Sequence, residues 1–330
     1  MKFELTDNLE KFALLIYADY LKNIEKELQG VIADKDIEYL HRMRVATRRL
    51  RAAGSFFADI IKTKKILKSQ KKIKKLTRLL GPRREKDVKV QYLKEQYKSA
   101  TEYKMRAALK RYISVLTISK NQMYPSIKKY LENLAKKNFF ALTLHYIDAR
   151  LNEIQYLEDE NPQHNFQKNI EKFKSVFSNI QKALQEITEY EIFINNPDNT
   201  HELHQMRIKI KKIRYIIEII NLLFENHFDD ALKILKELQT ILGDIHDADV
   251  WLHNIPFFLK TEKKKILEYF GDLKKFEKIE YGIKQFASHI EQIRNDKITE
   301  LLVFWQKLKA EKFNELLLKK IENILADGQK

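Results

Sequence analysis

Residues 41–51 read HRMRVATRRLR, and residues 204–214 read HQMRIKIKKIR, a copy displaced by 163 positions. A second pair follows in the same order: residues 80–88 read LGPRREKDV and residues 242–250 read LGDIHDADV, displaced by 162 positions. Two motifs that recur in one order at nearly one spacing indicate an internal duplication. We therefore expect a duplicated helical bundle with a pseudo-twofold axis.

The chain reads as helical almost throughout. Apolar residues recur at intervals of three and four, as at Phe12, Leu15 and Ile16, and only seven glycines and five prolines interrupt 330 residues. Breaks are expected at residues 30–36, 81–82, 121–125, 158–164, 195–200, 243 and 271–272, which predicts ten to twelve helices. The acidic, proline-bearing stretch 157–162 is the expected linker between repeats at 1–157 and 163–330.

Composition excludes several classes of protein. The absence of cysteine excludes disulfides, thiolate metal sites and a cysteine nucleophile. The first twelve residues lack the layout of a signal peptide, and the longest apolar stretch, 215–224, is too short to span a bilayer. We expect a soluble cytoplasmic protein without membrane insertion, and the sequence leaves its oligomeric state open.

The positive charge is concentrated in one block. Between His41 and Arg84 the chain carries sixteen Lys and Arg and a single acid, Asp59, whereas the other 286 residues carry 46 basic and 45 acidic residues. Self-repulsion of this strength requires an outside anion to offset it, so the block predicts a localised polyanion site. The alternative is an ordinary solvated lysine face.

Each copy of the first motif places its cations on one face of a helix. At 100° per residue, an arc of about 80° holds His41, Arg44, Arg48 and Arg51, with Arg42 and Arg49 on the flank. The opposite arc is the expected core face, with Met43, Ala46, Leu50, Ala53 and Phe57.

The second copy repeats this division. Its polar arc holds His204, Arg207, Lys211 and Arg214, and its core face holds Met206, Ile213, Ile217 and Ile220. Lys209 takes the place of Ala46 and should extend its amine outward, and Lys212 joins the predicted site. Neither motif contains an acid, so phosphate is the expected ligand, because arginine binds its oxygens through a bidentate fork. The alternative is an ion-pair network with carboxylates from neighbouring helices.

These motifs resemble those of the CHAD family, the conserved histidine α-helical domain. The family pattern H-x-x-R-V-x-x-R-R-L-R is met at residues 41–51, and its second-half form H-x-x-R-x-x-x-K-x-x-R-Y at residues 204–215. The pattern L-G-x-x-R-D-x-D-V is met at residues 80–88, with Glu85 in place of the expected aspartate.

The resemblance implies an all-α fold of two pseudo-symmetric antiparallel four-helix bundles, whose basic helices line a central groove. It also implies non-catalytic binding of inorganic polyphosphate, in the cytoplasm or at polyphosphate granules, with other polyanions as further candidate partners. The E-x-E-x-K signature of the tunnel enzymes fused to some members is absent from this sequence, so a stand-alone binding domain is expected. No cofactor, metal or catalytic residue is expected.

The stretch 62–75 carries eight lysines and no acid. Its apolar positions predict an amphipathic helix that forms a further wall of the groove, with Lys64, Lys68, Lys71 and Lys75 in contact with polyphosphate and Arg83 and Arg84 at its end. An anionic membrane surface is the alternative partner for this stretch. The second half has no matching lysine run, so the groove should be more cationic on the first-half side.

Histidines and aspartates near the motifs admit other roles. For His41 and His204, hydrogen bonding to phosphate is favoured over structural packing, and catalysis is disfavoured. His246, Asp247, Asp249 and His253 resemble a metal set, but Asp87 has no such histidines at the equivalent place in the first half. Asp87 and Asp249 are therefore expected to cap a helix or to brace a basic residue.

Two other functions are alternatives to polyphosphate binding. Sequence-nonspecific nucleic-acid binding is the alternative, but no aromatic residue lies on the cationic arc of either motif to stack a base. A phosphatase or kinase would need a carboxylate cluster for Mg²⁺ or a G-x-x-x-x-G-K loop, and the sequence has neither.

Overall fold

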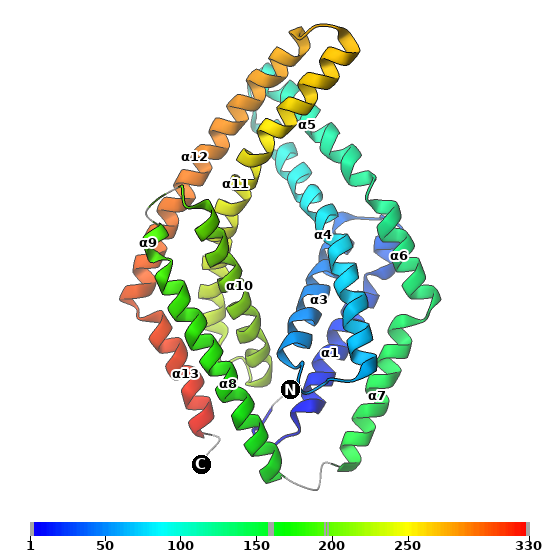
Figure 1. The fold of residues 1–330 in the computed structure, drawn as a ribbon, viewed down its shortest axis with the longest axis vertical. Coiled ribbons are helices and arrows are strands. Elements are labelled where there is room, and N and C mark those ends of the chain that lie inside the picture. The colour runs from blue at the N-terminus through cyan, green and yellow to red at the C-terminus, as the bar shows by residue number, and fades with distance from the viewer. Residues whose placement is uncertain (1–2, 158–161, 195, 197, 328–330) are drawn as a thin grey trace. The chain divides into compact units, whose positions relative to one another are not determined.

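The computed structural model describes residues 3–157, 162–194, 196 and 198–327, and within them it contains thirteen helices and no strand (Figure 1). The chain forms two compact units. We call Phe3–Glu95 with Tyr112–Asn169 the N-terminal unit, and Gln96–Arg111 with Ile170–Lys330 the C-terminal unit. The repeat boundaries 1–157 and 163–330 stay a prediction, and residues 158–161 of the predicted linker 157–162 lie outside the described residues.

The N-terminal unit is built from α1 to α7 and the first turns of α8. Its helices are α1 (Leu9–Lys26), α2 (Leu28–Ile32), α3 (Ile37–Phe56), α4 (Lys64–Ser99), α5 (Tyr103–Asn121), α6 (Tyr124–Lys136) and α7 (Phe139–Leu157). Asn8 and Asp36 start α1 and α3, because each side chain accepts a hydrogen bond from a backbone N–H two residues on. The buried Asn169 of α8 donates to the carbonyls of Leu5 and Asp7, both at 2.8 Å, which ties α8 to this unit.

The predicted core face of α3 is confirmed. Met43, Leu50 and Ala53 are fully buried, and Ala46 and Phe57 are buried as well. Full burial of a large apolar side chain stabilises a fold by about 1.5–3 kcal/mol, so this face holds α3 firmly against α1. The cationic arc of the same helix therefore points away from the interior.

The C-terminal unit contains the end of α4, the first turns of α5 and most of α8. Its remaining helices are α8 (Pro162–Glu189), α9 (Glu191–Ile194), α10 (Thr200–Leu223), α11 (Asp229–Phe270), α12 (Lys274–Ala310) and α13 (Phe313–Asp327). Helix α11 packs against both α10 and α12, and it ends at Gly271, whose φ of +73° is a conformation that glycine adopts readily. Met206, Ile213, Ile217 and Ile220 are buried, as predicted.

Two of the predicted helix breaks are wrong. Helix α4 continues through Gly81 and Pro82, and α11 continues through Gly243. In both helices apolar residues before and after the break are buried, among them Leu80 and Val90 in α4. This burial outweighs the local preference of glycine and proline for turns. The expected breaks at residues 121–125 and 271–272 are confirmed.

No helix among the described residues is long and apolar enough to cross a membrane.

Candidate polyanion-binding surfaces

Helices α3 and α4 lie side by side in the N-terminal unit (Figure 1). The Gln70 side chain donates to the carbonyl of Gly54 at 3.2 Å, and a guanidinium nitrogen of Arg84 lies 3.8 Å from a carboxylate oxygen of Glu38. These contacts join the end of α3 to the start of α4 and the start of α3 to the middle of α4. The two helices are therefore antiparallel, and their cationic arcs belong to one surface.

Most cations on the surface shared by α3 and α4 are exposed and have no carboxylate partner among the described residues. We define the N-terminal basic surface by seven of them: Arg49, Arg51, Lys64, Lys68, Lys71, Lys74 and Arg78. Lys64, Lys68 and Lys71 lie on the side of α4 opposite the fully buried Ile73. The ion-pair-network alternative fails for these side chains, because no described acid neutralises them.

Lys74 and Arg78 were not predicted as site residues. Both are exposed on α4, and they follow Lys71 at intervals of three and seven residues, which places them on the same side of the helix. This helical spacing was the signal in the sequence that could have identified them.

Aromatic side chains hold several other lysines of α4. The amines of Lys65, Lys72 and Lys75 lie 4.5, 4.6 and 5.0 Å from the ring centres of Tyr146, Phe139 and Tyr130, respectively. Lys75 is exposed and remains part of the predicted site, but its amine is oriented by Tyr130.

His41 and Arg84 lie at the other end of the α3–α4 pair. Burial, and then the positive charge of Arg84, hold the pKa of His41 below its ordinary value. A neutral imidazole at pH 7 has one donor and one acceptor, so it can donate a hydrogen bond to a phosphate oxygen. Arg44 and Arg48 are half-buried between this end and the exposed Arg51, and Arg42 forms an ion pair with Glu27 at 2.8 Å.

Arg83 has a different role from the one predicted. Its side chain is 3% exposed, a guanidinium nitrogen donates to Asp34 at 3.1 Å, and its Nε lies 3.7 Å from Asp87. The equivalent position in the second motif is the buried Ile245. Arg83 is thus an interior ion pair of the N-terminal unit, and it is not accessible to a polyanion.

In the C-terminal unit, α10 and α11 meet at His204 and His246, the positions that correspond to His41 and Arg84 of the N-terminal unit. The rings of His204 and His246 stack with their centres 4.2 Å apart. Arg207 lies beside Gly243, where an added Cβ would be 3.7 Å from its Nε, and that Nε is buried without a hydrogen-bond partner. Burial, followed by the charges of Arg207 and Lys211, lowers the pKa of His204.

Acids neutralise part of the cationic arc in this unit. Lys209 extends its amine to Glu186, as expected of a lysine on the core side, and this contact raises its pKa. Arg214 pairs with Glu218 and also donates to Gln239 at 2.8 Å. Lys211 is half-buried and Lys212 is exposed. We call His204, Arg207, Lys211 and Lys212 the C-terminal basic surface, which is smaller than the N-terminal one.

The two motif aspartates brace basic residues. Asp87 is buried and forms an ion pair with Lys120 of α5 at 2.8 Å, and Asp249 accepts a hydrogen bond from Arg294 of α12 at 2.5 Å. Capping, the other predicted role, is wrong because both aspartates lie inside continuous helices. Burial raises the pKa of Asp249, although Arg294 opposes this effect. No group of three His, Asp or Glu side chains in the described part of the chain could hold a metal ion.

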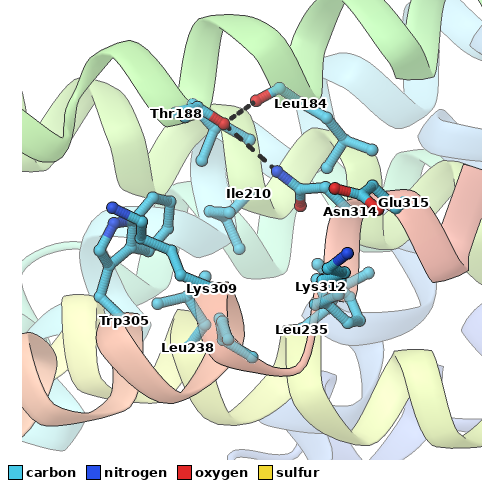
Figure 2. Close-up of a pocket in the computed structure, with 13 residues that line it drawn as sticks. Leu184, Thr188, Ile210, Leu235, Leu238, Trp305, Lys309, Lys312, Asn314 and Glu315 are labelled. Carbon is cyan, nitrogen blue, oxygen red and sulfur yellow. Dashed lines mark hydrogen bonds between the residues drawn. The ribbon is translucent and has the colours of Figure 1, made fainter.

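An apolar pocket of about 220 Å³ lies elsewhere in the C-terminal unit, between α8, α10, α11, α12 and α13 (Figure 2). Leu184, Ile210, Leu235, Leu238 and Trp305 are among the residues that line it. Polar groups at its edge bond to one another or to neighbours: Asn314 donates to Thr188 at 3.2 Å (Figure 2), and Lys309 donates to Glu191 at 2.6 Å. None of the residues that line this pocket belongs to either basic surface.

Comparison with known proteins agrees with this architecture. The family model named CHAD domain matches residues 16–255. The crystal structure of the CHAD domain from the plant Ricinus communis is similar, with a TM-score of 0.55 and 18% identity over 99% of this chain and 94% of that one. The structure of PptA from Streptomyces chartreusis has a TM-score of 0.54 and 12% identity, over 90% of this chain and 99% of its own. At these identities the two structures establish the fold alone. No curated protein sequence matches the chain.

Proposed function

Since this chain belongs to the CHAD domain family, we propose that it binds inorganic polyphosphate without catalysis, chiefly through the N-terminal basic surface. The observation that carries the proposal is a set of seven exposed cations on α3 and α4 for which no described residue supplies a carboxylate partner. When a linear polyanion lies along these cations, each phosphate that a cation contacts releases its bound counterions. This release favours binding.

The dimensions of α4 support a chain ligand over a single small anion. From Lys64 to Arg78 the helix rises by about 21 Å at 1.5 Å per residue. A single phosphate ion reaches only one or two of these side chains at once. A long polyphosphate chain contacts most of them together, so its affinity should grow with chain length.

The arrangement of aromatic rings disfavours nucleic acid as the ligand. Proteins that bind single strands stack bases on exposed aromatic side chains. Here none of the three rings next to α4 lysines is fully exposed: Phe139 is buried, and Tyr130 and Tyr146 are half-buried. The cationic arc of α3 carries no aromatic residue. Nucleic-acid binding is therefore the less favoured alternative, and the competition experiment described below must exclude it.

We further propose that the two units derive from one duplicated helical bundle. His41 lies near Arg84 as His204 stacks on His246, and Asp87 and Asp249 each brace a cation on the following long helix. In this account the C-terminal basic surface is the weaker site, because Glu186 and Glu218 neutralise Lys209 and Arg214. The central groove, the cytoplasmic location and the link to polyphosphate granules are expectations from the family resemblance.

A competition experiment tests this function. Labelled long-chain polyphosphate bound to the protein is challenged with unlabelled polyphosphate, DNA, RNA, heparin and tripolyphosphate at about 0.15 M salt. We expect long-chain polyphosphate to compete best and tripolyphosphate poorly. Equal competition by DNA or RNA would replace the proposal with nonspecific polyanion binding.

A further inference from the structure

A second cationic site lies in the C-terminal unit, near the turn between α11 and α12. A hollow of about 400 Å³ is lined by residues of α5, α11 and α12: Arg111, Lys265, Ile266, Tyr269, Phe270, Lys275 and Ile279. This volume is in the range of small-molecule sites. None of these residues belongs to the basic surfaces described above, and the hollow combines cations with aromatic rings.

Gly282 fixes the position of Arg111 in this hollow. A Cβ at residue 282 would lie 2.5 Å from the backbone oxygen of Lys104 and 2.7 Å from the Cβ of Ala108. The absence of a side chain thus allows the first turns of α5 to pack directly on α12. Arg111 follows Ala108 by about one helical turn, so the same contact positions the backbone that carries Arg111.

A buried carboxylate holds the guanidinium in place. Glu262 of α11 is fully buried, and it accepts from the Nε of Arg111 at 2.5 Å. No hydrogen bond among the described residues uses the two terminal nitrogens of Arg111. Lys265 lies 3.7 Å from the other oxygen of Glu262. Lys275 is the third cation of the lining, so these three cations and the buried Glu262 together carry a net charge of +2.

The aromatic rings of the hollow are unusually open to solvent. Tyr269 is 82% exposed and Phe270 is 46% exposed, and the amine of Lys275 lies 3.5 Å from the centre of the Phe270 ring. An exposed ring beside fixed cations is the combination that binds a planar base together with its phosphate.

We propose that this hollow binds a nucleotide. The base stacks on Tyr269, and the phosphates contact the terminal nitrogens of Arg111 and the amines of Lys265 and Lys275. The proposal does not depend on polyphosphate binding, because it places a ring-bearing ligand at different residues. It predicts that removal of the ring from the ligand, or of the ring from Tyr269, weakens binding at this hollow.

ATP is the probe, and tripolyphosphate is the comparison ligand that lacks the ring. Their affinities are measured by calorimetry at about 0.15 M salt on the full chain and on Tyr269→Ala, Lys275→Gln and Tyr103→Ala. Tyr103 is the matched control, because it is 77% exposed in the same unit but does not line the hollow. Arg111 is left unchanged, since its removal would leave Glu262 buried without its closest partner.

We expect ATP to bind more tightly than tripolyphosphate, and Tyr269→Ala to lower ATP affinity about tenfold while Tyr103→Ala leaves it unchanged. Lys275→Gln should weaken ATP severalfold. A quadruple variant of α4 lysines, Lys64→Gln, Lys68→Gln, Lys71→Gln and Lys75→Gln, should retain ATP binding even though it loses polyphosphate affinity. The proposal is overturned if ATP does not bind, if Tyr269→Ala has no effect, or if ATP binding is lost with the four α4 lysines.

Discussion

Neutralising the lysines of α4 should remove a predictable part of the salt dependence of polyphosphate binding. In the variant Lys64→Gln, Lys68→Gln, Lys71→Gln and Lys75→Gln, four phosphate contacts are lost. By analogy with single-stranded nucleic acids, each contact contributes about 0.7 to the slope of log affinity against log salt, so the slope should fall by about 3. Between 50 and 200 mM salt, the wild-type protein should then lose about 50-fold more affinity than the variant does.

The assay is fluorescence anisotropy of labelled long-chain polyphosphate, titrated at several salt concentrations. The variant should remain folded, because all four lysines are exposed and exposed substitutions usually change stability by less than about 0.5 kcal/mol. Lys75 loses the contact of its amine with the Tyr130 ring, whose centre lies 5.0 Å away.

A matched control separates position from net charge. Lys233, Lys264, Lys284 and Lys307 have side chains 63–78% exposed and lie outside both basic surfaces, so their replacement by Gln changes the charge equally. The reasoning is refuted if the α4 variant keeps the wild-type slope, or if the control variant loses as much of it.

Four further outcomes follow from the structure. Arg83→Leu should reduce the free energy of unfolding by about 1–3 kcal/mol, because Asp34 and Asp87 lose a buried partner although Asp87 keeps Lys120. Polyphosphate affinity of the folded protein should stay constant. Denaturant unfolding and anisotropy measure the two quantities, and a loss of affinity without a loss of stability would return Arg83 to the binding site. The pKa values of His41 and His204 are lowered in the folded protein, so their contribution to stability is present above pH 6.5 and is lost as the pH falls below that unfolded-state value. Bound polyphosphate should raise these pKa values again, so polyphosphate affinity should rise from pH 8 to pH 6. A double His41→Asn, His204→Asn variant should lose most of that rise. If the variant keeps the wild-type pH profile, both histidines are excluded from the site. Gly282→Ala should lower the free energy of unfolding by about 1–3 kcal/mol, because the added Cβ would meet the backbone of Lys104. A thermal melting temperature equal to that of the wild type would show that α5 does not pack on α12 at Gly282 as described.

The sequence predicted the faces of α3 and α10 because helical periodicity is a local property. Met43 and Met206 lie on the buried side of their helices as the 100° spacing requires. The exposed lysines of α4 were predicted by the same spacing, and Lys74 and Arg78 could have been added to them.

Features that depend on distant residues were not predictable. Arg83 was assigned to the binding site because its neighbours are basic, but its role is determined by Asp34, 49 residues earlier in the chain. The hollow beside Tyr269 depends on the pair of Arg111 and Glu262, which are 151 residues apart. Gly81 and Gly243 were read as breaks because local propensity favours a turn there, whereas packing along α4 and α11 continues the helix.

Lysine reactivity is the most direct test of where polyphosphate binds. The protein is acetylated briefly with and without saturating long-chain polyphosphate, and mass spectrometry measures the modification of each lysine. We predict that Lys64, Lys68, Lys71 and Lys74 are strongly protected, whereas Lys233, Lys264 and Lys307 react equally in both samples. Equal protection of all exposed lysines, or protection confined to the C-terminal unit, would contradict binding at the N-terminal basic surface.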